Sequence, residues 1–252
     1  MIGLYLALIG IVVGLVLDEL VVHLAIEPED DDEPSDIEDE AEPTGGGPSG
    51  CAETGSLALD ASSEEAAAGV AYTGSAWRRR LLIVGATAAL FAAAGARYQQ
   101  PEHLAVVTAY ICVLVVCAGT DLLSYRVPNV ITYPATLGAL LVGAVMPGTN
   151  FYETLAGGAL AGGVLLAPAL LTGGAGMGMG DVKLATFVGL AVGFVNVVPA
   201  LILMALAGGG AAAFLLVTRL RGRREPIPYA PFISFGALAV LLLWGTVFVD
   251  LA

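Results

Sequence analysis

The sequence has few charged residues and few cysteines. Only 13% of its 252 residues are charged and 57% are hydrophobic, and the apolar residues form long blocks rather than amphipathic stripes. This composition excludes an ordinary soluble domain and indicates a polytopic membrane protein, with the lipid bilayer as its main solvent. The three cysteines, Cys51, Cys112 and Cys117, do not have the spacing of a disulfide framework or a zinc site, so we expect no metal and no cofactor.

Positive charge is absent from one long segment. The formal net charge is -13, but Glu27 to Glu65 holds 15 of the 23 acids and neither Lys nor Arg, which leaves 10 basic and 8 acidic residues elsewhere. We therefore expect no nucleic-acid-binding surface on the membrane body. The segment is also rich in Gly, Pro and Ser, so it is predicted to be a disordered acidic loop. Three domains follow: a first transmembrane helix (1–26), the acidic cytoplasmic loop (27–76) and a seven-helix membrane core (77–252).

Long apolar stretches predict an all-α membrane bundle of about eight transmembrane helices. Ile2 to Ile26 has no basic region before it and no small-residue cleavage site, so it is predicted to be a retained anchor long enough to cross a bilayer of roughly 30 Å. Only Asn196 and Pro199 separate the sixth span from the seventh. The later spans are expected at Leu81–Tyr98, His103–Thr120, Val130–Met146, Thr154–Leu171, Val182–Asn196, Val197–Thr218 and Pro231–Val249.

The basic residues predict the orientation of these spans. Trp77 and Arg78 to Arg80 resemble the aromatic and basic collar of a cytoplasmic membrane boundary. If the spans alternate from there, nine of the ten basic residues fall on the cytoplasmic side and only Arg97 faces out. We therefore expect a multi-pass protein of the cytoplasmic membrane with both termini outside.

Two aspartates occupy matching places in this topology. Asp121 follows the third span, and Asp181 opens the sixth at the end of the glycine-rich run GGAGMGMGD. Ionisable groups in membrane segments usually face a wet or protein-lined interior and carry function. Two carboxylates that share one site tend to share a proton, as aspartic proteolysis requires, and neighbouring glycines leave room for an extended peptide.

Three other interpretations fit the same residues. Each aspartate can simply cap a helix or pair with a neighbour such as Arg126 or Lys183. The protein can instead be a small ion- or proton-coupled transporter in which both aspartates form a relay, although no internal repeat is visible. A non-catalytic scaffold that displays the acidic loop would need neither aspartate.

Two motifs carry a resemblance to a known family. Asp121 followed after five residues by Val127-Pro128-Asn129, together with GMGMGDVKL from Gly176 to Leu184, resembles the paired signature of the type IV prepilin peptidases, which are GxGD membrane aspartyl peptidases. GLVLDELVVH from Gly14 and IPYAPFISFG from Ile227 are similar to the family's first helix and to the segment before its last helix.

The resemblance implies an enzyme and its site. Asp121 and Asp181 would be the catalytic pair of an endopeptidase that removes basic leader peptides from prepilin-like precursors (pilins, pseudopilins or archaellin-like proteins) at the cytoplasmic face. The residues expected to shape the site or bind substrate are Gly176, Gly178, Gly180, Pro128, Asn129 and Lys183. Bifunctional members carry two Cys-x-x-Cys pairs after the first helix and also methylate the product. Only Cys51 stands there in this chain, so N-methyltransferase activity is not expected.

Overall fold

The computed structural model describes residues 2–26, 57–171, 177–218, 228–246 and 249–250. The chain divides into two compact units, of which Met1–Glu27 with Leu81–Ala252 form the first and Pro28–Arg80 the second. Most of the predicted acidic loop, Cys51 and Gly176 lie outside the described residues.

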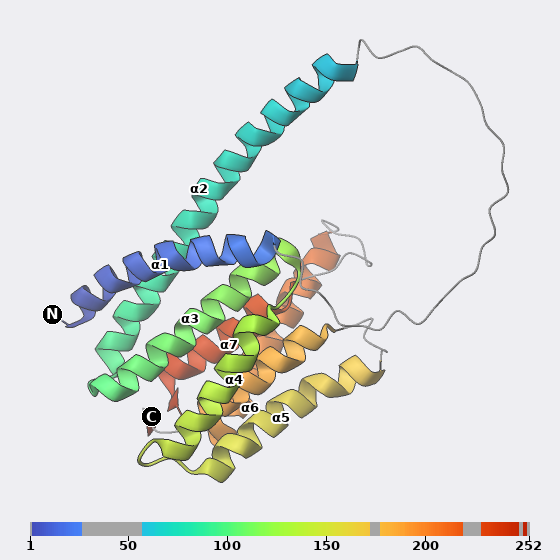
Figure 1. Ribbon diagram of the computed structural model, residues 1–252. Helices are drawn as coiled ribbons and strands as arrows, with labels where there is room; N and C mark the ends of the chain where they lie inside the picture. The colour runs from blue at the N-terminus through green and yellow to red at the C-terminus, as the bar shows by residue number, and fades with distance from the viewer. Residues whose placement is uncertain (1, 27–56, 172–176, 219–227, 247–248, 251–252) are drawn as a thin grey trace, which may run out of the picture. The chain divides into compact units, whose positions relative to one another are not determined.

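Seven helices and one short strand pair make up the described structure (Figure 1). The strands β1 (Gly245–Thr246) and β2 (Val249–Asp250) pair antiparallel directly after the last helix. The helices are α1 (Ile2–Ile26), α2 (Leu57–Arg97), α3 (Pro101–Ser124), α4 (Asn129–Val145), α5 (Phe151–Leu171), α6 (Met179–Thr218) and α7 (Ala230–Leu243).

The prediction of a polytopic helical membrane protein is confirmed, with a different helix count. Five of the described helices are long and apolar enough to cross a membrane, and α4 and α7 are shorter apolar helices. The count is seven rather than about eight because the predicted spans Val182–Asn196 and Val197–Thr218 both lie in the 40-residue helix α6.

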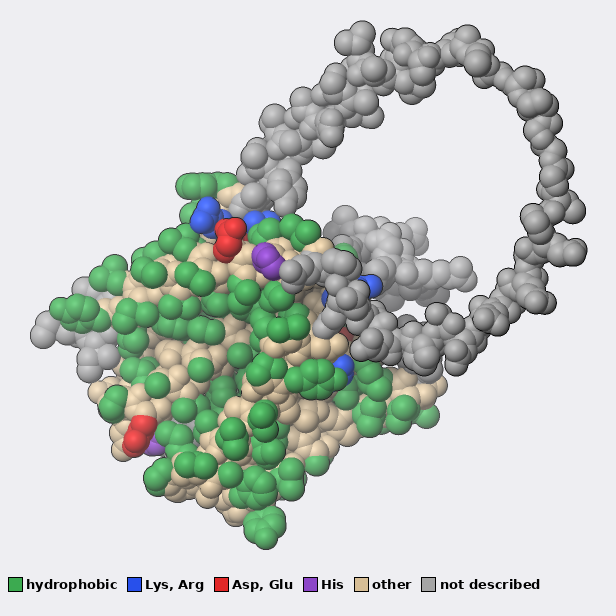
Figure 2. All heavy atoms as spheres, viewed as in Figure 1, with side chains coloured by type: hydrophobic (Ala, Val, Ile, Leu, Met, Phe, Trp, Pro, Cys, Tyr) green, Lys and Arg blue, Asp and Glu red, His purple; other side chains and the backbone are tan. Residues whose placement is uncertain are grey.

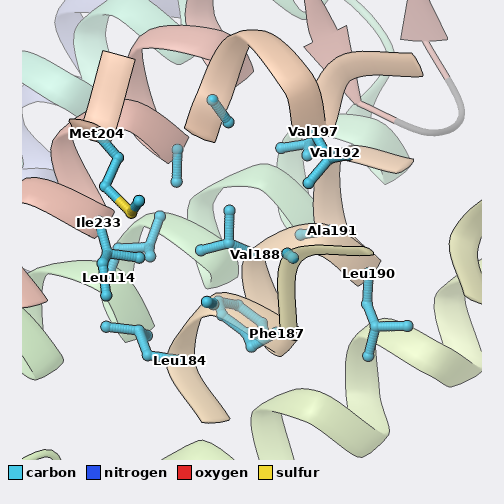
Figure 3. Close-up of a cluster of buried hydrophobic side chains, with 14 of the residues drawn as sticks. Leu114, Leu184, Phe187, Val188, Leu190, Ala191, Val192, Val197, Met204 and Ile233 are labelled. Atoms are coloured by element: carbon cyan, nitrogen blue, oxygen red, sulfur yellow. The ribbon is translucent and has the colours of Figure 1, made fainter. Parts of the chain in front are cut away.

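Helix α6 is interrupted at Gly193, not at Asn196 or Pro199. Gly193 has φ 79° and ψ 170°, a backbone conformation that glycine adopts without the steric cost paid by other residues. Residues on both sides of this break line one small cavity, so the two halves of α6 pack against each other (Figure 3). The cavity is lined by Ala185 and Val188 before the break, Val197, Ala200, Leu201 and Met204 after it, and Ala161 and Ile233 from α5 and α7.

The hydrophobic core is built around the first half of α6. Phe187 and Leu184 are fully buried there, in one cluster with Leu114 of α3 and Ile233 of α7 (Figure 3). The ring of Tyr110 meets the ring of Phe187 edge-on, with centroids 5.5 Å apart. Burial of these side chains fixes the start of α6 against α3 and α7.

The outer surface of the bundle is apolar as well. Figure 2 shows hydrophobic side chains spread over most of the described part of the visible face, with charged groups at only a few places. Large side chains such as Val12, Val145 and Leu206 are more than half exposed. An apolar surface of this extent fits a lipid environment, where interhelical contacts rather than water exclusion hold the helices together.

Helix α2 begins earlier than the sequence suggested. The acidic loop was expected to continue to residue 76, whereas α2 starts at Leu57. The reason lies in its composition, because residues 57–76 include seven alanines and two adjacent glutamates, Glu64 and Glu65, and both residue types favour helix. The predicted loop and α2 therefore overlap over residues 57–76.

Glycines bring α5 and α6 into backbone contact. A Cβ added to Gly157 would collide with the carbonyl oxygen of Gly189, and one added to Gly189 would collide with that of Gly157. Gly158 and Gly162 lie against the side chains of Leu190 and Thr186 of α6. Small residues that let helix backbones approach closely are typical of membrane interfaces.

Two side chains at the end of α2 and directly after it cap the far end of α7. Arg97 Nε and Nη2 donate to the carbonyl oxygens of Leu242 and Leu243, each at 2.9 Å. The buried hydroxyl of Tyr98 donates to Leu241 O at 2.5 Å. These carbonyls belong to the last turn of α7, where helical carbonyls have no intrahelical partner, and a cation there also complements the helix dipole.

Replacing Gly157 by alanine tests the glycine contact between α5 and α6. We expect Gly157→Ala to lower the free energy of unfolding by about 3 kcal/mol, because a methyl group against a backbone carbonyl cannot be relieved by a rotamer change. Thermal unfolding in detergent measures this effect. Gly163→Ala on the same helix is the matched control, since its Cβ would meet nothing within 4 Å; equal losses in the two variants would contradict the assignment.

The Tyr98 cap gives a second stability prediction. Tyr98→Phe removes one buried hydrogen bond and nothing else, so we expect a loss of about 1 kcal/mol in unfolding free energy. Tyr152→Phe is the control, because the Tyr152 side chain is 80% exposed. If both variants unfold at the wild-type temperature, the hydroxyl of Tyr98 does not stabilise α7.

Candidate active site

Asp121 lies in the last turn of α3, just before a sharp reversal of the chain. Tyr125 ends the helix with φ 55° and ψ 31°, and its N–H donates to the backbone oxygen of Asp121 at 2.9 Å. This left-handed conformation is uncommon for a residue with a side chain and is a frequent way to end a helix. Pro128 then serves as the N-cap residue of α4. The Asp121 side chain is 5% exposed.

Asp181 lies in the first turn of α6, after the glycine-rich run. Its backbone N–H donates to Gly178 O at 3.1 Å, and a Cβ at Gly178 would lie 3.9 Å from Asp181 Oδ2. A Cβ at Gly180 would lie 3.0 Å from the Cβ of Val127, closer than side chains normally approach. Glycine at position 180 thus lets the start of α6 rest against the α3–α4 connection.

A hydrogen bond also joins the two motifs. Lys183 Nζ donates to Asn129 Oδ1 at 2.7 Å, and the same ammonium group lies 4.8 Å from the centre of the Tyr133 ring. Lys183, which one alternative interpretation offered as a partner for an aspartate, thus ties α6 to the first turns of α4. We call Lys183, Asn129 and Tyr133 the clasp.

The start of α7 completes the arrangement. The backbone N–H of Ala230 donates to Asp121 Oδ2 at 2.9 Å, and this hydrogen bond is buried. Burial raises the pKa of Tyr229, the residue before it, and the negative charge of Asp181 raises that pKa further. Two adjacent residues at the start of α7 therefore interact with the two aspartates. Ala230 donates a hydrogen bond to Asp121, and the pKa of Tyr229 responds to the charge of Asp181.

The two aspartates belong to motifs that the fold brings together. Asp121 and Asp181 are 60 positions apart in the sequence, yet the Lys183–Asn129 hydrogen bond and the contact of Gly180 with Val127 join their motifs. Two like charges in a largely buried site cannot both be accommodated easily, so such a pair tends to hold one proton between them. A pair of this kind can supply one group that accepts a proton and one that donates it.

The structure brings together most of the residues that the sequence singled out. Asp121, Asp181, Gly178, Gly180, Pro128, Asn129 and Lys183 all lie at the junction of α3, α4 and α6. Gly176 lies outside the described residues. Among the residues that the structure describes, no group of three or more His, Cys, Asp or Glu side chains is placed to hold a metal ion.

Ala230 and Tyr229 were not singled out by the sequence analysis. Their segment was noted only for a general likeness, because a backbone N–H leaves no signature in the residue type. One signal was available in retrospect. Pro231 is the second residue of α7, and proline in a first turn marks the start of a helix, where unpaired N–H groups collect.

The chain is similar to known leader peptidases. Residues 108–216, which include both aspartates, match the model of the type IV leader peptidase family. A prepilin leader peptidase/N-methyltransferase of Bacillus subtilis is 31% identical over 159 residues, which is 62% of this chain and 62% of that protein. The protein of that name from Aeromonas hydrophila is 32% identical over 137 residues, 53% of this chain and 47% of its own length.

A third relative gives a similar result. The prepilin leader peptidase/N-methyltransferase of Xanthomonas campestris pv. campestris is 31% identical over 147 residues, covering 55% of this chain and 50% of that protein. The chain thus spans between about half and 62% of the length of these relatives. No solved structure matches it. On the matched region and the relatives together, residues 108–216 of this chain match the type IV leader peptidase family.

Proposed function

We propose that the protein is an aspartyl endopeptidase that removes the leader peptide from type IV prepilin-like precursors at the cytoplasmic face of the membrane. Family membership supports the peptidase class. The single observation that supports the mechanism is that the Lys183–Asn129 hydrogen bond joins the motifs of Asp121 and Asp181, which come from two different helices.

The chemistry needs only the two carboxylates and one water molecule. The ionised aspartate takes a proton from water as the water oxygen attacks the peptide carbonyl, and the protonated aspartate donates a hydrogen bond to the carbonyl oxygen. General acid and general base catalysis of this kind each contribute about 10²- to 10⁴-fold in rate. No covalent intermediate is needed.

The position of the pair suits a substrate with a polar leader and an apolar helix. Asp121 is in the last turn of α3 and Asp181 in the first turn of α6, so both carboxylates lie at helix ends rather than in the middle of the bundle. A scissile bond just outside a hydrophobic helix can reach such a site while that helix stays in lipid. Gly178 and Gly180 leave space for the extended peptide.

The clasp would hold the two aspartates at their working distance. Lys183 is two residues after Asp181, and Asn129 is eight residues after Asp121, so the bond between their side chains fixes the spacing of the two motifs. The tyrosine ring under the ammonium adds a cation–π contact. Displacing a catalytic group by about 1 Å costs up to about 100-fold in rate.

The proposal covers peptide cleavage only. The relatives are named as both peptidases and N-methyltransferases, but the chain spans only part of their length. Cysteine is scarce in the region after the first helix, where Cys51 stands alone. We therefore propose no methyl transfer and no zinc for this chain.

Substituting each aspartate tests the peptidase proposal. Purified protein in liposomes is mixed with a synthetic peptide that joins a basic prepilin leader to its hydrophobic helix, and the shortened product is quantified by mass spectrometry. We expect Asp121→Asn and Asp181→Asn each to lower the cleavage rate by about 100-fold or more, because each removes one half of the acid–base pair.

The control for this experiment is Glu102→Gln, which removes an exposed acid in the first turn of α3 and should leave cleavage unchanged. Wild-type protein that leaves the peptide intact, yet takes up protons or cations in an aspartate-dependent way, would replace the peptidase proposal by the transporter alternative.

The clasp is tested by a double-mutant cycle. Lys183→Met and Asn129→Leu each break the same hydrogen bond, so we expect each to lower kcat by about tenfold with little change in KM. The double variant should be no slower than the slower single variant, because residues that act through one contact are not additive. Lys183→Arg, which keeps a donor and a cation over Tyr133, should recover most of the rate.

Two results would argue against the clasp as a positioning device. Fully additive losses would mean that Lys183 and Asn129 act separately. A rise in KM at constant kcat would mean that one of them binds the substrate instead.

A further inference from the structure

The two aspartates differ in their hydrogen bonding. Asp121 accepts a buried hydrogen bond from the N–H of Ala230 at 2.9 Å. Ala230 is fully buried, so water does not compete for this N–H. Asp181 accepts no hydrogen bond from any residue within the described ranges.

The N–H of Ala230 is one that α7 cannot use itself. Ala230 is the first residue of α7, and the N-cap residue Tyr229 makes no side-chain capping hydrogen bond. The first N–H groups of a helix have no intrahelical partner. Asp121 supplies the missing acceptor from α3, 109 positions earlier in the chain.

Helix dipoles alone would assign the charge differently. Asp121 lies at the carbonyl end of α3, which disfavours its ionised form, whereas Asp181 lies at the amide end of α6, which favours ionisation. Each helix end changes the ratio of ionised to protonated carboxyl by a factor of about 2 to 5. At Asp121 the amide end of α7 offsets the carbonyl end of α3. A hydrogen bond to a charged group changes the same ratio by a factor of about 10 to 100. The hydrogen bond therefore decides the balance.

We propose that Asp121 is the general base of the pair, that Asp181 is the general acid, and that the Ala230 N–H is the positioning group that keeps Asp121 ionised. This assignment rests on the proposed peptidase function and adds which aspartate plays which part. Ala230 acts only through Asp121 and does not touch the substrate.

The proton movements balance under this assignment. Asp121 takes a proton from water as the water oxygen bonds to the carbonyl carbon, and Asp181 gives its proton to the carbonyl oxygen, which yields a gem-diol. The proton on Asp121 then passes to the leaving nitrogen as the C–N bond breaks, and Asp181 takes one back from a hydroxyl of the diol. An acid and an amine leave, and both aspartates return to their starting states.

The cation of the clasp, Lys183, lies two residues after Asp181, and its ammonium group is held by Asn129 and Tyr133. Two further titratable groups near the pair do not compete for the negative charge. Cys117 faces Asp121 from one turn earlier on α3, and Tyr229 faces Asp181 from the start of α7. A thiol and a phenol are both neutral at neutral pH. The pH dependence of the reaction should therefore report the two aspartates as a coupled pair.

Comparing the two asparagine variants tests the assignment. Asparagine cannot accept a proton from water, but its amide still donates a hydrogen bond to a carbonyl oxygen. With the leader peptide described above, we expect Asp181→Asn to retain at least about tenfold more activity than Asp121→Asn. Its remaining activity should lose the alkaline limb of the bell-shaped pH profile and keep the acidic limb.

A backbone change at position 230 tests the positioning group itself. Lactic acid introduced there by nonsense suppression replaces the N–H of Ala230 by an ester oxygen and leaves the methyl side chain in place. We expect the acidic limb of kcat/KM to move to higher pH by about one to two units, because the ionised form of the base loses its donor. Alanine reintroduced by the same method is the matched control, and thermal unfolding shows whether the ester variant keeps its fold.

The outcomes separate this inference from the peptidase proposal. Wild type that cleaves, with Asp121→Asn as active as Asp181→Asn or more so, would overturn the assignment and leave the peptidase proposal intact. A folded ester variant whose acidic limb does not move would overturn the role of Ala230. Wild type that fails to cleave would overturn both.

Discussion

An ionised carboxylate among apolar helices needs a hydrogen-bond donor that is already in place, and the start of α7 supplies one. The N–H of Ala230 donates a hydrogen bond to Asp121, and the Asp121 carboxylate in turn gives the first turn of α7 an acceptor for an otherwise unpaired N–H. At the other end of α7, Arg97 and Tyr98 donate to its last carbonyls. A 14-residue helix is thus held at both ends by side chains from α3 and from the end of α2.

Close backbone contacts place the other aspartate. Gly157 and Gly189 bring α5 against the first half of α6, and Gly180 brings the first turn of α6 against Val127. The break at Gly193 then returns the second half of α6 to the same core. Hence the position of Asp181 depends mainly on glycines that let neighbouring backbones approach closely, whereas the position of the Asp121 side chain depends on a hydrogen bond.

The sequence predicts most of the helices and both aspartates, but not the helix break, the start of α2 or the contact of Ala230 with Asp121. Long apolar runs located the helices, and the two motifs located Asp121 and Asp181, because both signals depend on residue type. The interruption at Gly193 was expected near Asn196 and Pro199, since a sequence with many glycines does not show which one adopts a positive φ. The start of α2 at Leu57 was missed because acidic composition outweighed the helix propensity of alanine. The Ala230 contact depends on a backbone group and on tertiary packing.

Helix α7 contributes to the site but lies outside the region that matches the family. The matched region, residues 108–216, contains both aspartates and the clasp but ends before α7 begins at Ala230. Nothing within the described part of that region donates a hydrogen bond to either carboxylate. The ends of α3 and α6 alone would favour the ionised form of Asp181 rather than that of Asp121. A preference for ionised Asp121 requires an additional donor, and in the described structure that donor comes from α7.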